Sequence, residues 1–299
     1  MYPLNITANK TALLAYSPRS AGEPRFFVSM ATLPLRSPHK TIHSILSFQT
    51  RAPAEVVLVV APRVFLRFPG KTVNLEKIKS DFPNETRLET RYCAADYGPG
   101  SKTLCALPRL REVVAAADPS DANWALVVVD DDKQYRGWSL GGLFDAMRAL
   151  PLQWHAFGYS AHEVQVPGMS TLRMLQGCDM FAMPASQILA GAAIDRFFEC
   201  ALRQSPAYRW HDDFWVSAYL AFARNLSMVL VPVNYTGIAS MDRHNWRKTA
   251  NWKQGSLAGT VSKGHASVKG GIARSSRKEV ERDTSRYLRD TLRLCVSPT

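Results

Sequence analysis

The sequence predicts an α/β protein with a mostly parallel central sheet and helices on both faces. Two apolar runs of strand length, 55–61 and 124–130, lack the polar alternation of a sheet with one solvated face. Runs of this kind are typical of parallel strands covered on both sides. Helical patterns separate the strands, as in the βαβ units of parallel sheets. We therefore expect one domain over residues 25–240.

The first half of this domain is expected at about 25–135. Ser37 is predicted as the N-cap of the first helix, with Pro38 in its first turn. Pro108 is expected to kink or split a later helix, because proline lacks the amide that a helix interior requires. The expected elements are a strand at 26–31, a helix after Pro38, strands at 55–61 and 87–93, a helix interrupted at Pro108 and a strand at 124–130.

The remaining half, 136–240, has a different character. Its expected elements are a helix in SLGGLFDAMRAL capped by Ser139, β structure in WHAFGYSAHEVQV and CDMFAMP, helices in ASQILAGAAIDRFFECAL and HDDFWVSAYLAFARN, and a last strand in MVLVPV. Residues 1–24 are expected to form a loose arm. Residues 241–299 are expected to form a basic Gly/Ser-rich loop and a C-terminal helix.

Charge is unevenly placed along the chain. The net charge is +12, and residues 243–299 hold thirteen Lys or Arg against four Asp or Glu. Such a segment is either a solvated tail or a basic surface that attracts phosphate groups, nucleic acid or anionic lipid. Attraction to anionic lipid would give peripheral membrane contact. We find no apolar run long enough to span a membrane.

Cysteine and asparagine usage bears on the compartment. The five cysteines contain no C-x-x-C pair, and their odd number argues against a full disulfide framework. The N-terminus does not read as a signal peptide. Five of the nine asparagines nevertheless begin Asn-x-Ser/Thr sequons: Asn5, Asn9, Asn84, Asn225 and Asn234. The compartment stays open between cytoplasm and Golgi lumen, and the sequons favour the lumen.

Three consecutive aspartates, Asp130, Asp131 and Asp132, follow the apolar strand at 124–130. On an extended backbone Asp130 and Asp132 share a face and Asp131 points away. Two carboxylates this close repel each other when desolvated, which protonation or a divalent cation would offset. An open two-carboxylate site suits Mn²⁺ or Mg²⁺ bound together with phosphate oxygens. The alternative is that the aspartates cap the next turn and face water.

Four segments in one order resemble GT-A-type glycosyltransferases, which use nucleotide-sugar donors. FVSMATLPLR is similar to the first strand and nucleotide loop of that fold, and VVVDDDKQY to its D-x-D region. DYGPGSK and HDDFWVSAYL resemble the D-x-G-P-x-x-K and E/D-D-x-W motifs of one subgroup. The resemblance covers about residues 25–240. It implies a GT-A-like single domain, in which about 25–135 is the nucleotide-binding half and 136–240 the acceptor half. It also implies a UDP- or GDP-sugar donor and a glycan or other hydroxyl acceptor.

The resemblance also implies roles for individual residues. In the nucleotide-sugar site they are Thr32, Arg36, Asp96, Lys102, Asp130 and Asp131. Lys102 follows a glycine-rich turn near a helix start, where amides and a lysine favour phosphate. The metal ligands would be Asp130, Asp132 and a late-loop histidine, for which His244 is favoured over His265.

Asp213 is the predicted general base. A positioned carboxylate can take the proton of an acceptor hydroxyl as the new bond forms, and in the resembling enzymes an aspartate here marks inversion at the anomeric carbon. Asp212 or Asp213 could instead only cap the helix. Trp210, Phe214 and Trp215 could stack on a sugar, although core packing is favoured for Phe214 and Trp215.

Two other functions remain open. A metal-dependent phospho- or nucleotidyltransferase also needs paired aspartates and basic residues, but we find no Walker motif. A basic nucleic-acid-binding protein would use the C-terminal charge, but that segment lacks interleaved aromatic residues. We therefore expect no nucleic-acid partner.

Overall fold

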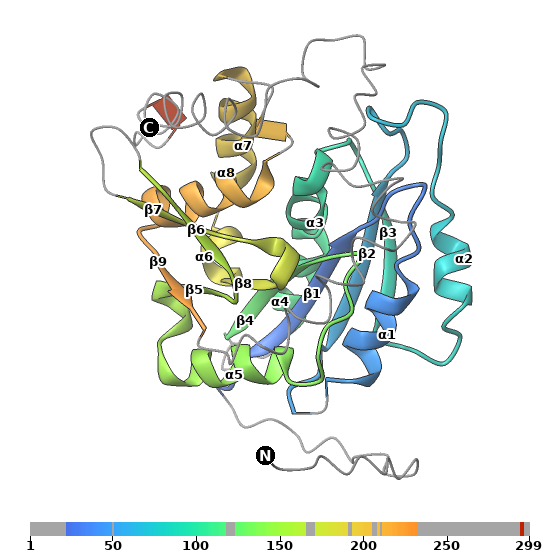
Figure 1. The fold of residues 1–299 in the computed structure, drawn as a ribbon, viewed down its shortest axis with the longest axis horizontal. Helices are drawn as coiled ribbons and strands as arrows, with labels where there is room; N and C mark the ends of the chain where they lie inside the picture. The colour runs from blue at the N-terminus through green and yellow to red at the C-terminus, as the bar shows by residue number, and fades with distance from the viewer. Residues whose placement is uncertain are drawn as a thin grey trace, which may run out of the picture.

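The computed structural model describes residues 22–49, 51–117, 123–165, 171–190, 193–204, 208–209, 211–231 and 294–295. One seven-stranded sheet in the order β3-β2-β1-β4-β8-β5-β9 organises them (Figure 1). Its strands are β1 (Arg25–Ala31), β2 (Val56–Pro62), β3 (Leu88–Cys93), β4 (Trp124–Asp130), β5 (His155–Gly158), β8 (Phe181–Pro184) and β9 (Ser227–Leu230). A separate antiparallel pair joins β6 (Ala161–Val164) to β7 (Leu172–Leu175).

Strand direction is mostly parallel, as predicted. Strands β3, β2, β1 and β4 run in parallel. Strand β8 is antiparallel to both β4 and β5, and β9 is parallel to β5. Six strands therefore share one direction and β8 alone opposes them. The coarse α/β prediction is confirmed for the part of the chain that the structure describes.

Helices cover both faces of the sheet. The α-helices are α1 (His39–Ser47), α2 (Leu75–Ser80), α3 (Ser101–Leu104), α4 (Leu107–Ala116), α5 (Ser139–Ala149), α6 (Ala185–Ile188), α7 (Ala193–Gln204) and α8 (Asp212–Ala218). Short 3-10 turns form η1 (Gly98–Gly100), η3 (Leu152–Trp154) and η4 (Gly177–Asp179), and a π-helix, η6 (Tyr219–Ala223), extends α8.

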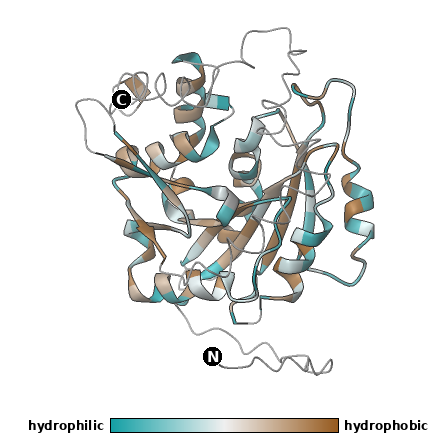
Figure 2. Ribbon diagram, in the orientation of Figure 1, coloured by the Kyte–Doolittle hydropathy of each residue, from teal (hydrophilic) through white to brown (hydrophobic). Residues whose placement is uncertain are grey.

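The central strands are buried on both sides. In β1, Phe26 and Val28 pack into one apolar cluster with α1, α2 and α5, while Phe27 packs into a second cluster with α3, α4 and α6 to α8. Alternate side chains of a strand point to opposite faces, which explains the division. The predominantly hydrophobic colour of the central strands in Figure 2 follows from this double coverage.

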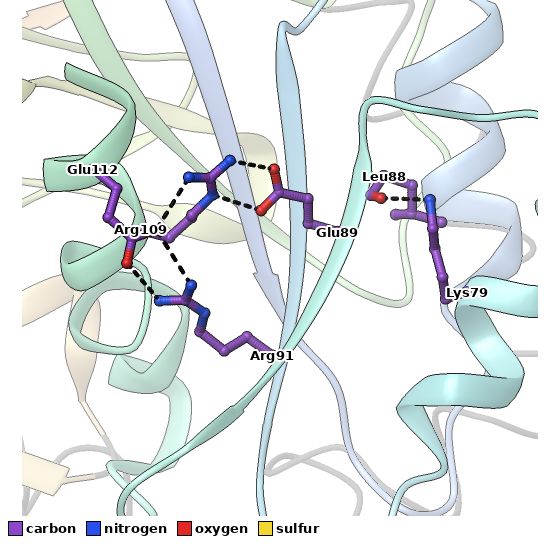
Figure 3. A network of polar contacts seen from close by, with 6 residues as sticks. All are labelled: Lys79, Leu88, Glu89, Arg91, Arg109 and Glu112. Atoms are coloured by element: carbon purple, nitrogen blue, oxygen red, sulfur yellow. Dashed lines mark hydrogen bonds and ion pairs between the residues drawn. The ribbon is translucent and has the colours of Figure 1, made fainter. Parts of the chain in front are cut away.

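Polar contacts attach the flanking helices to the edge strand β3 (Figure 3). Arg109 of α4 donates to both carboxylate oxygens of Glu89, at 2.7 and 2.8 Å, and also to Glu112. On the other side, Lys79 of α2 donates to the backbone oxygens of Leu88 and Glu85. The edge strand is thus held from both faces by charged side chains as well as by packing.

Several boundary predictions were wrong in detail. Pro38 is itself the N-cap of α1 and Ser37 does not cap it, and Trp138 rather than Ser139 is the N-cap of α5. The run ASQILAGAAIDRFFECAL forms two helices, α6 and α7, and CDMFAMP becomes a strand only from Phe181. Helix α2 and strand β7 were not predicted. The split at Pro108 is confirmed, because α3 ends at Leu104 and proline stands in the first turn of α4.

Two disulfides join cysteines that the sequence left unpaired. Cys93, at the end of β3, is bonded to Cys105 after α3, and Cys200 of α7 is bonded to Cys295. Four of the five cysteines are therefore paired, although the odd number still prevents a framework that pairs every cysteine within the chain. The first bond closes the loop that carries the D-Y-G-P-G-S-K motif.

The Cys93–Cys105 bond is expected to stabilise the fold by about 3 kcal/mol, the loop-closure entropy of a loop of this length. The test uses a chain with Cys200 and Cys295 replaced by alanine, so that only this bond responds to reduction and its sulfur atoms stay in place. Urea unfolding should show the reduced form losing about that free energy. Superimposed unfolding curves for the oxidised and reduced forms would contradict the expectation.

Candidate functional site

The candidate site lies at the carboxyl edge of the sheet, where β1 and β4 end side by side. Ala31, the last residue of β1, is paired with Asp130, the last residue of β4. The loop after β3 and the start of the opposed strand β8 reach the same edge. Ligands of open α/β sheets bind outside these strand ends. Four segments that are far apart in sequence therefore meet here.

A buried lysine connects two acidic motifs. The Lys102 ammonium lies 2.9 Å from Asp130 Oδ1 and 3.1 Å from Asp212 Oδ2, and the residue is 4% exposed. Burial by itself lowers the pKa of Lys102. The carboxylates of Asp130, Asp212 and Asp213 outweigh that effect and hold the pKa well above its usual range. Lys102 is therefore a fixed cation between β4 and α8.

Close packing around Lys102 requires a glycine at position 177. A Cβ atom at Gly177 would lie 2.6 Å from Lys102 Nζ and 3.1 Å from Asp213 Oδ1. The Gly177 amide donates to Asp213 Oδ1 at 2.8 Å. The turn η4 thus places a backbone donor, a lysine and two aspartates within one small volume.

The three consecutive aspartates divide differently from the sequence prediction. Strand β4 ends at Asp130, and Asp131 and Asp132 lie in the turn that follows. Alternation along a strand therefore stops before it reaches Asp132. Arg36 forms ion pairs with both Asp131 and Asp132, the second at 3.4 Å. The predicted pairing of Asp130 with Asp132 on one face, with Asp131 pointing away, was wrong in this respect.

Each aspartate of the triplet has its own electrostatic environment. Burial raises the pKa of Asp132 to about 6, with Asp130 and Asp131 adding to the effect and Arg36 opposing it. Burial also disfavours the Asp130 carboxylate, but Lys102 and the more distant Arg36 together lower its pKa. The Asp130 side chain is 32% exposed, so its carboxylate remains accessible from the site. Asp131 is almost fully buried.

The aspartate pair at the start of α8 also divides into two roles. Asp212 is buried and its carboxylate pairs with Lys102, so it does more than cap the helix, the alternative that the sequence had left open. The N-cap of α8 is His211, which makes no side-chain cap bond. Burial raises the pKa of Asp213 to about 8, and the neighbouring Asp212 carboxylate adds to the shift. Phe214 and Trp215 are buried in the core, as favoured.

Thr32 and Asp96 have structural contacts at the same edge. Thr32 follows β1 directly and is 1% exposed, and its amide donates to the Val60 oxygen at 3.0 Å. Asp96 accepts from the amides of Leu66 and Gly98, both at 2.8 Å. Asp96 therefore ties the loop after β2 to the loop that leads to Lys102. Their predicted nucleotide contacts remain predictions.

A second guanidinium, that of Arg67, lies near Arg36 and was not predicted from the sequence. Burial and, to a smaller extent, the proximity of Arg36 lower the pKa of Arg67 to about 10, with Asp96 opposing the shift. Arg36 itself has a raised pKa, because Asp131 and Asp132 outweigh the effect of its burial. Arg67 lies in the loop after β2, a segment without a recognisable motif. Its position in the fold is the only signal that reveals it.

The loop after the triplet is fixed by α1. The Tyr135 hydroxyl accepts from the Asp130 amide at 3.0 Å, and the Tyr135 amide donates to Ser44 at 3.1 Å. Gln49 donates to the Arg136 oxygen and accepts from the Leu140 amide. These contacts hold the three aspartates in register with Arg36, and no motif predicted them.

The predicted metal set is incomplete within the described part of the chain. Asp130 and Asp132 are present at the edge, and His244 and His265 lie outside the described residues, as does Trp210. The residues described contain no group of three His, Cys, Asp or Glu side chains placed to hold a metal ion. Two features still fit a divalent cation with open positions. They are the accessible Asp130 carboxylate and the second Asp131 oxygen, which is buried without a hydrogen-bond partner.

Comparison with protein-family models gives no match for this chain, and a search of curated proteins gives none either. The fold and the site define an α/β protein with a cluster of aspartates and basic residues at the carboxyl edge of its sheet. Among the residues described, no helix is both long enough and apolar enough to cross a bilayer.

The raised pKa of Asp213 predicts an unusual pH dependence of stability. The folded state holds this proton up to about pH 8, whereas an unfolded aspartate releases it near pH 4. Stability from this group is therefore lost as pH rises from about 4 to 8. Asp213→Asn keeps an acceptor for the Gly177 amide and removes the titration. The melting temperature of Asp213→Asn minus that of wild type should therefore grow as the pH rises through this range. The expected change is about 2–4 °C for each kcal/mol of stability that wild type loses.

Asp212→Asn is the matched control, since it makes the same change one residue away. It removes a partner of buried Lys102, so it should lower the unfolding free energy at pH 7 by about 1–3 kcal/mol. Thermal unfolding between pH 4.5 and about 8.5 measures both effects. A difference between Asp213→Asn and wild type that stays constant over this range would contradict the assigned pKa.

Proposed function

We propose that this protein is a glycosyltransferase that moves a sugar from a nucleotide-sugar donor to a hydroxyl acceptor. The observation that carries the proposal is Lys102, which joins the D-x-D region to the H-D-D-F-W segment through contacts at 2.9 and 3.1 Å. The four segments of the GT-A resemblance thus meet at one edge of the sheet.

The basic residues suit a nucleoside diphosphate. Arg36 and Arg67 lie close enough to depress the Arg67 pKa, and two such guanidinium groups are stabilised by an anion between them. Arg36 follows β1 and Arg67 follows β2, so both belong to the nucleotide-binding half. We place the diphosphate between these arginines and Asp130.

A divalent metal, Mn²⁺ or Mg²⁺, is part of the proposal. Asp130 and Asp132 would hold it, with His244 as a further ligand. Such an ion would neutralise charge on the diphosphate leaving group. The aspartates already have internal partners in Lys102 and Arg36, so the ion would compete with Arg36 for Asp132.

Asp213 is the proposed base of an inverting reaction. The acceptor hydroxyl gives its proton to the Asp213 carboxylate while its oxygen bonds to the anomeric carbon. The bond from that carbon to the diphosphate breaks, and the diphosphate leaves with the electron pair. A carboxylate whose pKa is about 8 is a stronger base than an ordinary aspartate, which suits this proton transfer. The Gly177 amide orients it.

The sharpest binding test is Asp132→Ala. Metal-dependent binding of UDP or GDP, measured by calorimetry with Mn²⁺, should be lost, while the fold is kept because Arg36 retains Asp131. The control is Asp145→Ala, an exposed aspartate of α5 paired with Arg51. Equal affinity of Asp132→Ala and wild type for nucleotide and metal would refute the metal assignment. Stabilisation by ATP rather than by nucleoside diphosphates would favour the phosphotransferase alternative.

The catalytic test is Asp213→Asn. Donor affinity should be nearly unchanged and turnover should fall by roughly 10²-fold or more, because an amide cannot accept the proton. For wild type, kcat/KM should rise with pH until about 8 and then level off. Product configuration is read by proton NMR. Retention of the donor configuration, or near-wild-type turnover of the variant, would leave Asp213 without a catalytic role.

A further inference from the structure

The two disulfides place a constraint on where this protein folds. Cys93 and Cys105 have Cα atoms 5.4 Å apart, and those of Cys200 and Cys295 are 5.7 Å apart, within the range that disulfides require. Disulfides of this structural kind persist in oxidising compartments and are rare where glutathione keeps thiols reduced. The second bond joins positions 95 residues apart. It therefore needs a folded chain and an oxidant together.

An independent observation points to the same compartment. Two of the five sequons fall within the described residues, and both are exposed. Asn84 lies with Thr86 in the turn between α2 and β3, and Asn225 precedes Ser227 after the π-helix. Asn225 has a positive φ of 53°, a turn conformation that asparagine adopts readily. Both sites combine an exposed asparagine with an exposed hydroxyl residue two positions later.

Sheet topology places both sequons at the edge of the sheet where the parallel strands begin. Asn84 comes four residues before β3 and Asn225 two residues before β9. Strands β3, β4 and β9 all run in the same direction, because the reversal at β8 is undone at β5. Both asparagines therefore stand at the amino edge of the sheet. The aspartate and lysine cluster stands at the carboxyl edge, so glycans at these positions leave the site open.

We propose that the protein matures in the secretory pathway and carries N-linked glycans at Asn84 and Asn225, on the amino edge of the sheet. The transferred group is the oligosaccharide of a lipid-linked diphosphate donor. The side-chain amide nitrogen bonds to the anomeric carbon of the sugar and gives one proton to a base of the modifying enzyme, while the bond from that carbon to the lipid diphosphate breaks and the diphosphate leaves with the electron pair. The inference does not depend on the proposed function, since it rests on disulfides, exposure and topology alone.

The test begins with the protein isolated from the cells that make it. Digestion with peptide N-glycosidase in heavy-oxygen water converts each glycosylated asparagine to a labelled aspartate, which peptide mass spectrometry locates. Labels are expected at both Asn84 and Asn225. A non-reduced digest should contain the Cys93–Cys105 and Cys200–Cys295 peptides as crosslinked pairs. Unlabelled peptides at both asparagines, or free thiols at these cysteines, would overturn the proposal, and one unlabelled position would overturn it for that residue.

Matched variants separate the modification from folding defects. Thr86→Ala and Ser227→Ala each destroy one sequon while leaving its asparagine in place, and each should remove one glycan from the full chain in the same cells. Thr86→Ser and Ser227→Thr keep the sequons and should keep the glycans. A glycan that persists in an alanine variant would show that the assigned asparagine is not the modified one.

Discussion

The ammonium group of Lys102, buried between Asp130 and Asp212, is the interaction on which the site depends. An uncompensated buried charge is costly, so the fold must deliver carboxylates to it from β4 and from α8 at the same time. The loop that carries Lys102 is closed by the Cys93–Cys105 bond and tied to the loop after β2 by Asp96. These restraints fix the position of Lys102 Nζ, and one carboxylate of each acidic motif pairs with it.

Charge balance explains why five aspartates can lie so close together. Lys102 compensates Asp130 and Asp212, and Arg36 compensates Asp131 and Asp132. The pKa is raised for Asp132, which lies 3.4 Å from Arg36, and for Asp213, which is not among these four paired carboxylates. Lys102 and Arg36 thus offset the repulsion between carboxylates, for which the sequence had suggested a metal ion or protonation. Any bound metal would be added to a site that is already partly neutralised.

The parts predicted from sequence were those with a strong local signal. Apolar runs of strand length located β2 and β4, and Pro108 located the break between α3 and α4. The D-Y-G-P-G-S-K and H-D-D-F-W segments stand out in the sequence alone. Helix α2 is only six residues long and lies in a polar segment, so periodicity had too few residues to reveal it.

The parts that failed depend on where the chain turns or on partners remote in sequence. Face alternation was extended to Asp132, two residues past the end of β4, although the strand itself was predicted to end at Asp130. The contacts of Arg36 with Asp131 and of Lys102 with Asp212 span 95 and 110 positions, and a linear pattern carries no information about them. Burial raises the pKa of Asp213 and the Asp212 carboxylate adds to the shift, so this basic carboxylate becomes visible only after the sheet has brought β4, η4 and α8 to one edge. The geometry of the site is therefore a property of the strand order, which linear motifs do not record.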